Sequence, residues 1–273
     1  MHAESRVTYG EVPHTLDGTV LAECRWQMLG DEFLLRTDGD HYFHYRRGDG
    51  VTVERSSEAD PAEEKLWLDG SVYSAIASLN GLLPIHASAI AVNGKVFAFT
   101  GPAGAGKSTL VAALGERGLP MFCDDTLILD LSDPNRVTCL PGHKRLKLTA
   151  QALDLTGATA EERVSPSVDK VFARSAAGDV RTMLPLAELI FLEEGDGPII
   201  APITGSERLL RLRDDHQTAH LFSAARQFDQ SGLFEHLARL GSQIAMARLV
   251  RPMDATRFAE GVALAAEYVT DAT

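Results

Sequence analysis

Apolar and polar residues alternate over the first part of the chain in the manner of short strands. The segments "DEFLLRT" (31–37) and "HYFHYRRGDGVTVERS" (41–56) are rich in aromatic and β-branched residues, which are typical of strands. They are broken by "DGD" and "GDG", which are hairpin turn signals. We therefore expect residues 1–70 to form a small β-rich N-terminal region.

The next segments predict a loop and then a short helix. "SSEADPAEE" (56–64) is polar throughout and reads as a surface loop, whereas "GSVYSAIASLNGLLP" (70–84) has the pattern of a helix that ends at a glycine and a proline. We place the start of a second domain near this helix, so that residues 71–273 form the larger domain.

From residue 84 onward, strand patterns alternate with helix patterns. "HASAIAV" (86–92) and "KVFAFT" (95–100) are joined by Asn93-Gly94, which predicts a tight hairpin of antiparallel strands. "STLVAALGERG" (108–118) predicts a helix that ends at Gly118, and "PMFCDD" (120–125) and "TLILDL" (126–131) predict strands. This alternation predicts an α/β domain with a mixed sheet.

The last third of the chain continues the alternation. We expect a buried strand in "AELIFLEEG" (187–195), helices in "GSERLLRLRDD" (205–215) and "SGLFEHLARLGSQI" (231–244), and a final strand in "AMARLV" (245–250). The chain then predicts a helix that Asp254 caps. Its apolar face consists of Phe258, Val262, Ala265 and Val269.

Composition and charge exclude several classes of function. The chain of 273 residues has 26 basic and 38 acidic residues and a formal net charge of −12, which argues against a general nucleic-acid or anionic-membrane surface. No apolar run approaches a membrane span, and the first residues lack the apolar core of a signal peptide. We therefore expect a cytoplasmic protein. The spacing of Cys24, Cys123 and Cys139 fits neither a zinc site nor a disulfide framework, so we expect reduced, packed thiols.

The strongest chemical signal is "GPAGAGKS" (101–108), which fits the G-x-x-x-x-G-K-[ST] phosphate-binding pattern at every required position. A strand pattern precedes it and a helix pattern follows, as the mechanism of phosphate binding requires. Lys107 would reach the β and γ phosphates of ATP, and the Ser108 hydroxyl would bind Mg²⁺. The predicted nucleotide-binding residues are Gly101, Ala103, Gly104, Ala105, Gly106, Lys107, Ser108 and Thr109.

Asp124 and Asp125 follow an apolar strand downstream of this loop. Neighbouring side chains of a strand point to opposite faces, so we expect the two carboxylates to have different tasks. One would hold Mg²⁺, directly or through water, while the other would accept a proton from an attacking hydroxyl. Asp130, after the next strand, is a competing metal ligand. His86 opens the strand before the loop strand, and spacing alone favours a structural role for it.

Three elements together, namely His86, the phosphate-binding loop and the Asp124-Asp125 pair, resemble the catalytic domain of bacterial HPr kinase/phosphorylase. The resemblance implies a nucleotide-binding domain of the PEP carboxykinase type that transfers phosphate to a serine. It also implies that Asp125 is the base, with His86 as its partner and Lys107 as the phosphate clamp. Asp124 is then left for the metal.

The segment "CLPGHKRLKLTAQALDLTG" (139–157) departs from that family because it has no acidic residue before Asp154. This places a second metal carboxylate and the reverse phosphorylase reaction in doubt. The departure and the β-rich start are more similar to the HPr-kinase-like proteins of lasso-peptide biosynthesis. Arg145, Lys147 and Lys170 could meet a phosphate or an acidic peptide. The family's later arginine could be Arg208, Arg211 or Arg213. His216 and His220 have the i, i+4 spacing of a metal-binding pair, but no third ligand has a suitable spacing, so we expect a surface pair.

The sequence therefore predicts an ATP- and Mg²⁺-dependent serine kinase that acts on a peptide or small protein, such as a lasso-peptide-type precursor. One alternative is a kinase for HPr or for a small metabolite. Another, from a different class, is a nucleotide-binding regulator that transfers no phosphate. We expect no nucleic-acid or membrane partner, and the resemblance leaves a homo-oligomer open.

Overall fold

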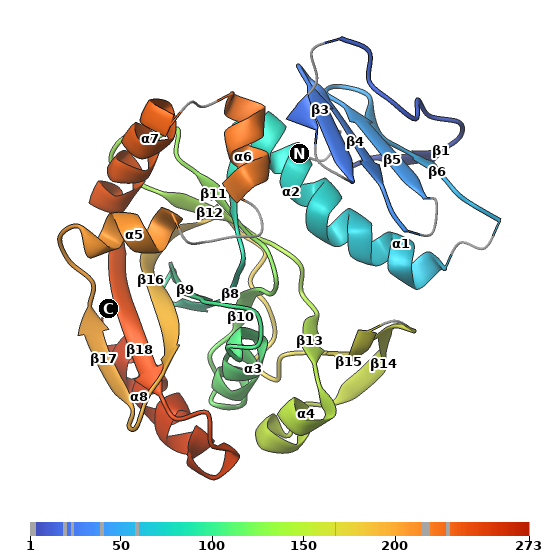
Figure 1. Ribbon diagram of the computed structural model, residues 1–273. Coiled ribbons are helices and arrows are strands. Elements are labelled where there is room, and N and C mark those ends of the chain that lie inside the picture. Colours follow the sequence, from blue (N-terminus) through green and yellow to red (C-terminus); the bar gives the residue numbers. More distant parts are fainter. Residues whose placement is uncertain are drawn as a thin grey trace. The chain divides into compact units, whose positions relative to one another are not determined.

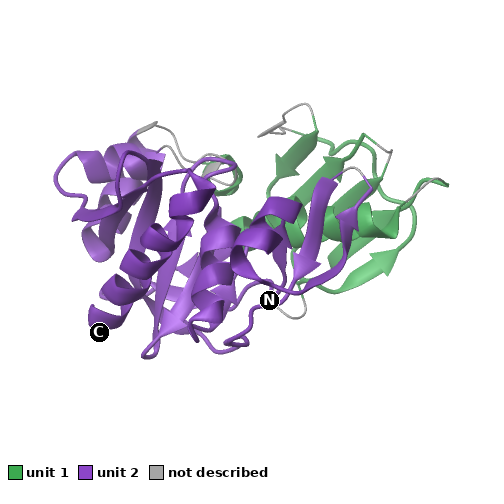
Figure 2. Ribbon diagram, turned by 90° about the horizontal axis from the view of Figure 1, so that it is seen from below, with its two compact units in different colours: residues 1–84, 218–230 green, residues 85–217, 231–273 purple. Residues whose placement is uncertain are grey.

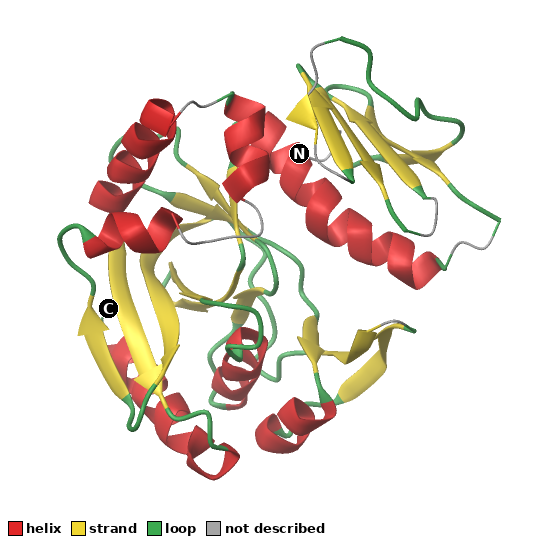
Figure 3. Cartoon of the chain, in the orientation of Figure 1, coloured by secondary structure: helices red, strands yellow, loops and turns green. Residues whose placement is uncertain are grey.

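The computed structural model divides the chain into two compact units (Figure 2). The first consists of Met1–Pro84 with Thr218–Gln230, and the second of Ile85–Gln217 with Ser231–Thr273. The structure describes residues 4–18, 21–22, 25–38, 41–57, 60–166, 168–213, 219–227 and 230–272. Strands and helices occur in both units (Figure 3). Among the described residues, no helix combines the length and the apolar character needed to cross a membrane.

The first unit contains a sheet in the order β1-β6-β5-β4-β3-β2, in which β1 and β6 are parallel and the other pairs are antiparallel. Its strands are β1 (Val7–Tyr9), β2 (Leu21–Ala22), β3 (Trp26–Leu29), β4 (Glu32–Arg36), β5 (Tyr42–Arg46) and β6 (Gly50–Glu54). Alternate side chains such as Phe33, Phe43 and Val53 form the core of this unit. The predicted β-rich start and the "GDG" hairpin are confirmed; Gly39 and Asp40 of "DGD" lie outside the described residues.

The helical segment of this unit begins earlier than predicted. It runs as α1 (Pro61–Trp67), a π-helical turn η1 (Leu68–Val72) and α2 (Tyr73–Leu79). Asp60 caps its start by accepting a hydrogen bond from the Ala62 amide, and Pro61 fits the first helical position. The predicted loop at 56–64 is therefore wrong in its second half. The apolar face of this segment packs on the sheet, which moves the unit boundary from residue 70 to Pro84.

Residues 218–230 return to the first unit as part of a later segment of the chain. They include α6 (Ala219–Arg226), whose Leu221, Ala224 and Ala225 pack with the core of the N-terminal sheet. The sequence did not predict this return, because nothing local distinguishes α6 from the other helices of the C-terminal half.

The second unit is built on a mixed sheet in the order β10-β8-β9-β16-β12-β11, with β18 beside β16 and β17 beside β18 (Figure 1). The bounds are β8 (Ala87–Val92), β9 (Lys95–Thr100), β10 (Met121–Cys123), β11 (Leu127–Asp130), β12 (Thr138–Leu140), β16 (Leu184–Glu194), β17 (Ile199–Pro202) and β18 (Ala245–Arg251). The short strand β7 (Leu83–Ile85) lies where the chain passes from the first unit to the second. The predicted α/β class with a mixed sheet is confirmed. So is the hairpin of β8 and β9, with Asn93 and Gly94 both at positive φ.

Three neighbouring strands of this sheet, β9, β16 and β18, run parallel. Parallel strands end at the same edge of a sheet, so the loops that follow β9 and β18 meet there. α3 (Lys107–Glu116) follows β9 and α8 (Phe258–Asp271) follows β18. Both helices contribute to one apolar core with the sheet, through Leu110 of α3 and Val262 of α8 among others.

The remaining elements complete the second unit. A small antiparallel sheet has the order β13-β15-β14, and α5 lies beside α7 because Arg208 donates hydrogen bonds to the carbonyls of Gly241 and Ile244. The bounds are β13 (Leu146–Leu148), α4 (Ala150–Thr156), β14 (Ala160–Ser165), β15 (Val168–Ala173), α5 (Glu207–Arg213), α7 (Gln230–Gln243) and the 3-10 turn η2 (Ala255–Arg257). Asp254 caps the turn η2, which leads into α8, by accepting a hydrogen bond from the Thr256 amide, whereas the N-cap position of α8 itself is Arg257.

We expect Leu110→Ala to lower the free energy of unfolding by about 2–5 kcal/mol, because it removes a large side chain from a packed core. Leu110 is 0% exposed, whereas Leu210 of α5 is 60% exposed. Leu210→Ala is the matched control and should change stability by no more than about 0.5 kcal/mol. Urea unfolding followed by circular dichroism measures both. Equal losses in the two variants would contradict the assigned core.

Candidate functional site

The glycine loop, residues 101–106, lies between the carboxyl end of β9 and the start of α3. Gly104 and Gly106 have φ of 84° and 80°, which a residue with a side chain adopts only at a cost. The side chain of Lys107 lies over the loop, where its Nζ donates hydrogen bonds to the carbonyl oxygens of Gly101 at 2.8 Å and Pro102 at 3.1 Å. The lysine side chain is thus held at the loop, at the N-terminal end of a helix.

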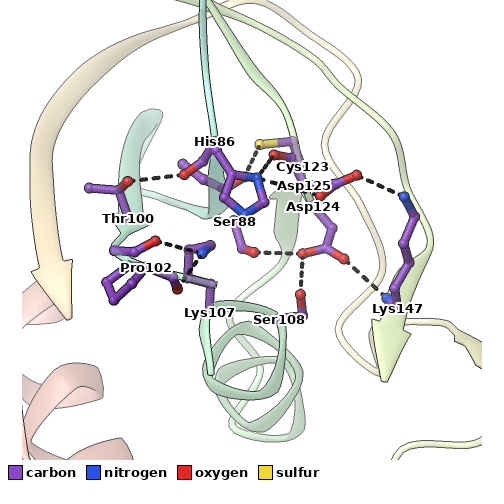
Figure 4. A network of polar contacts seen from close by, with 12 residues as sticks. His86, Ser88, Thr100, Pro102, Lys107, Ser108, Cys123, Asp124, Asp125 and Lys147 are labelled. Carbon is purple, nitrogen blue, oxygen red and sulfur yellow. Dashed lines mark hydrogen bonds and ion pairs between the residues drawn. The ribbon is translucent and has the colours of Figure 1, made fainter. Parts of the chain in front are cut away.

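Asp124 is the buried centre of the site and is 1% exposed. Its Oδ1 accepts hydrogen bonds from the hydroxyls of Ser88 at 2.5 Å and Ser108 at 2.8 Å. Its Oδ2 accepts from the backbone N–H of Lys147 at 3.0 Å. One carboxylate therefore joins β8, the first turn of α3 and β13 (Figure 4).

Asp125 lies at the cavity surface next to a lysine and a histidine. Its Oδ2 forms an ion pair with Lys147 Nζ at 2.7 Å, and its Oδ1 lies 3.5 Å from His86 Nδ1. The same histidine nitrogen is 2.8 Å from the Asp125 carbonyl oxygen. A carbonyl oxygen only accepts, so Nδ1 of His86 carries the proton. Asp125 has φ of 72°, a left-handed conformation that aspartate tolerates better than most residues.

The charges around the cavity set the protonation states of this pair. Burial alone would raise the pKa of Asp125, but the ammonium group of Lys147 outweighs it and the net pKa lies below the ordinary value. Burial lowers the pKa of His86, and the charge of Lys107 lowers it further. Asp125 is therefore ionised and His86 is neutral at pH 7.

Most of the predicted site residues line one cavity of about 480 Å³. These are His86, Ala103, Gly104, Gly106, Lys107, Ser108, Thr109, Asp124 and Asp125. Gly101 and Ala105 lie outside the wall, where their carbonyl oxygens accept hydrogen bonds from Lys107 and Arg251. Lys147 and Lys170, the candidates for contact with a phosphate or an acidic peptide, are also part of the wall.

Other candidates from the sequence do not reach this cavity. Asp130 accepts a hydrogen bond from the Ser132 amide within its own turn. Arg145 forms ion pairs with Glu161 and Glu162. Arg208 binds the carbonyls near the end of α7, and Arg211 pairs with Glu193 and Glu207. His216 and Cys24 lie outside the described residues, whereas His220 belongs to the first unit and packs against Trp26.

The sequence did not single out Ser88 or Arg251, although both line the cavity. Ser88 carried a usable signal, because residues two apart on a strand share a face and His86 lies two residues before it. Arg251 carried no local signal. Its position depends on the pairing of β18 with β16, which only the folded sheet reveals.

The residues present fit a Mg²⁺ ion that arrives with a nucleotide. The Ser108 hydroxyl donates a hydrogen bond to Asp124, which leaves the lone pairs of its oxygen available to a metal. Among the described residues, no three His, Cys, Asp or Glu side chains gather in a way that could hold a metal. Mg²⁺ commonly takes one or two protein oxygens and completes its shell with phosphates and water, so Ser108 with Asp124 is a suitable partial site.

The comparisons with known proteins find only distant likeness, and only among solved structures. No family model matches the chain, and no curated protein matches its sequence. Among solved structures, the HPr(Ser) kinase/phosphatase from Coxiella burnetii is 14% identical, with a TM-score of 0.37 over 69% of this chain and 88% of that chain. An overlap this low carries no conclusion about function.

We expect Lys147→Met to raise the pKa of Asp125, because burial then acts without the opposing ammonium charge. Carboxyl carbon shifts in a pH titration by NMR measure it. Arg145→Met is the matched control, since Arg145 pairs with Glu161 and Glu162 instead. An unchanged Asp125 pKa in Lys147→Met would contradict the ion pair.

The same pair makes stability depend on pH. The folded pKa of Asp125 lies below its ordinary value, so the pair stabilises the fold at neutral pH and this contribution is lost as the pH falls through the folded pKa. In Lys147→Met this contribution is absent, so the free energy of unfolding should fall less than in the wild type as the pH is lowered.

Proposed function

We propose that the protein is an ATP- and Mg²⁺-dependent kinase that transfers the γ-phosphoryl group to a hydroxyl, specifically to a serine of a peptide or small protein. The single observation that carries this proposal is the position of Asp125. An ionised carboxylate shares one cavity with Lys107 and Ser108, at the start of a helix behind a glycine loop. A protein that only bound nucleotide would need the loop but not a second, partly exposed carboxylate.

The loop and the first turn of α3 would bind the phosphates. Backbone N–H groups at a helix N-terminus attract anions, and Lys107 adds a full positive charge. Ser108 and Asp124 would hold Mg²⁺, which would supply neutralisation of the charge on the transferring phosphoryl group. Asp124 is fixed by Ser88 and by the Lys147 amide, so Ser108 is oriented before any ligand arrives.

Asp125 would accept the proton of the attacking hydroxyl. In its paired state the carboxylate is a weak base, because Lys147 stabilises its charge. General-base catalysis is strongest when the pKa of the base lies near the working pH, so a shift of Lys147 toward the negative phosphates would strengthen the base. His86 is neutral and donates to the Asp125 carbonyl, which fixes the turn that presents this carboxylate.

The nature of the acceptor follows from the sequence resemblance and from the charge of the wall. Lys147 and Lys170 both line the cavity beside Asp125, so acidic groups near the acceptor serine would be favoured. A lasso-peptide-type precursor is the acceptor we propose to test first. HPr and small hydroxylated metabolites are the alternatives from the same class of reaction.

We expect Asp125→Asn to retain ATP binding and to slow phosphoryl transfer by on the order of 10²- to 10⁴-fold, because the amide cannot accept the proton. Asp130→Asn is the matched control, since Asp130 lies outside the cavity wall. Calorimetry measures ATP binding, and transfer of labelled phosphate measures turnover. Normal turnover in Asp125→Asn would exclude Asp125 as the base.

The acceptor assay separates the two classes of function. The wild-type protein is incubated with labelled ATP, Mg²⁺ and a panel of serine peptides, HPr and small metabolites, and mass spectrometry locates any added phosphate. Transfer to a peptide serine supports the proposal. Binding of ATP without transfer to any acceptor would instead indicate a nucleotide-binding regulator.

A further inference from the structure

Arg251 reaches the glycine loop from the far end of the chain. It is the last residue of β18, which runs parallel to β16, as β16 does to β9. This order brings the end of β18 to the edge at which the loop begins. There, Nη2 of Arg251 donates a hydrogen bond of 2.6 Å to the carbonyl oxygen of Ala105.

The guanidinium of Arg251 is buried. The residue is 4% exposed, and its Nε is a buried donor that finds no hydrogen-bond partner among the residues that the structure describes. Within the part of the chain that the structure describes, Arg251 forms no ion pair, and burial lowers the pKa of its side chain. A buried, uncompensated charge is costly, so a nearby anion would relieve an existing cost. Arg251 is also part of the cavity wall.

Two glycines make room for this side chain. A Cβ at Gly106 would lie 2.7 Å from Nη2, and a Cβ at Gly261 would lie 3.1 Å from Cδ of Arg251. Gly106 is already required by the conformation of the loop. Gly261 lies inside α8, where glycine is a poorer choice than alanine. The passage of Arg251 explains why this position of the helix has no side chain.

We propose that Arg251 is a positioning residue that holds the glycine loop through Ala105 and supplies the uncompensated positive charge that a polyphosphate neutralises. This inference rests on the proposed function, in which the loop binds the phosphates of ATP. Two hydrogen bonds from different elements then hold the loop. Lys107 of α3 donates to the Gly101 carbonyl, and Arg251 of the last strand donates to the Ala105 carbonyl.

The test compares Arg251→Met, Arg251→Lys and the control Arg257→Met. Arg257 pairs with Glu260 outside the cavity wall. Calorimetry with inorganic tripolyphosphate and with Mg²⁺-ATP gives affinities, and thermal unfolding gives the stability of the free protein. We expect Arg251→Met to bind both ligands about 10- to 100-fold more weakly, the range for loss of one charged contact. Arg251→Lys should fall between it and the wild type, and Arg257→Met should match the wild type.

Stability separates a charge role from a merely structural one. Since the charge is buried without a counter-ion among the described residues, Arg251→Met should melt at the wild-type temperature or above it when no ligand is present. A lower melting temperature with unchanged tripolyphosphate affinity would overturn the proposal. So would equal affinities in Arg251→Met and wild type. If neither the wild type nor any variant binds tripolyphosphate or ATP, the proposed function itself fails.

Gly261→Ala decides the case if Arg251→Met does not fold. The added methyl group presses on the stem of Arg251 but leaves its charge in place, and alanine favours the helix. We expect a folded variant, checked by thermal unfolding, with a severalfold weaker affinity for tripolyphosphate. Wild-type affinity in this folded variant would overturn the role assigned to Arg251.

Discussion

The buried carboxylate of Asp124 is the contact on which the rest of the site depends. Its oxygens accept from the Ser88 hydroxyl, the Ser108 hydroxyl and the Lys147 amide, and so they join three segments that are distant in the sequence. A charge in this position requires all of its donors, because an unsatisfied buried carboxylate is costly. These hydrogen bonds fix β8, the start of α3 and β13 to the residue that follows β10. They therefore also fix the position of the neighbouring Asp125.

The two adjacent aspartates thus lie in different surroundings. Asp124 is buried and accepts three hydrogen bonds, whereas Asp125 has a left-handed backbone and a side chain that is 35% exposed. Lys147 serves both residues, with its amide on Asp124 and its ammonium group on Asp125. Any movement of β13 would therefore change the charge balance at Asp125 directly.

Local signals in the sequence predicted much of this arrangement, and contacts between distant segments account for the rest. The glycine loop, the Asn93-Gly94 hairpin and the capping Asp254 follow from a few adjacent residues, so they could be predicted. The start of α1 was missed because Asp60 and Pro61 resemble a turn as much as a helix start. The ion pair of Lys147 and the approach of Arg251 depend on which strands lie together, which no short pattern specifies.

The return of α6 to the first unit gives the chain an interlaced connectivity. The polypeptide passes from the first unit to the second, back for residues 218–230, and then again into the second for β18 and α8. Leu221, Ala224 and Ala225 would lose their apolar partners if the N-terminal sheet were removed. The first unit is therefore built from two separate parts of the chain. Residues 218–230 complete its core, and they lie in the sequence between two parts of the second unit, shortly before the strand that carries Arg251.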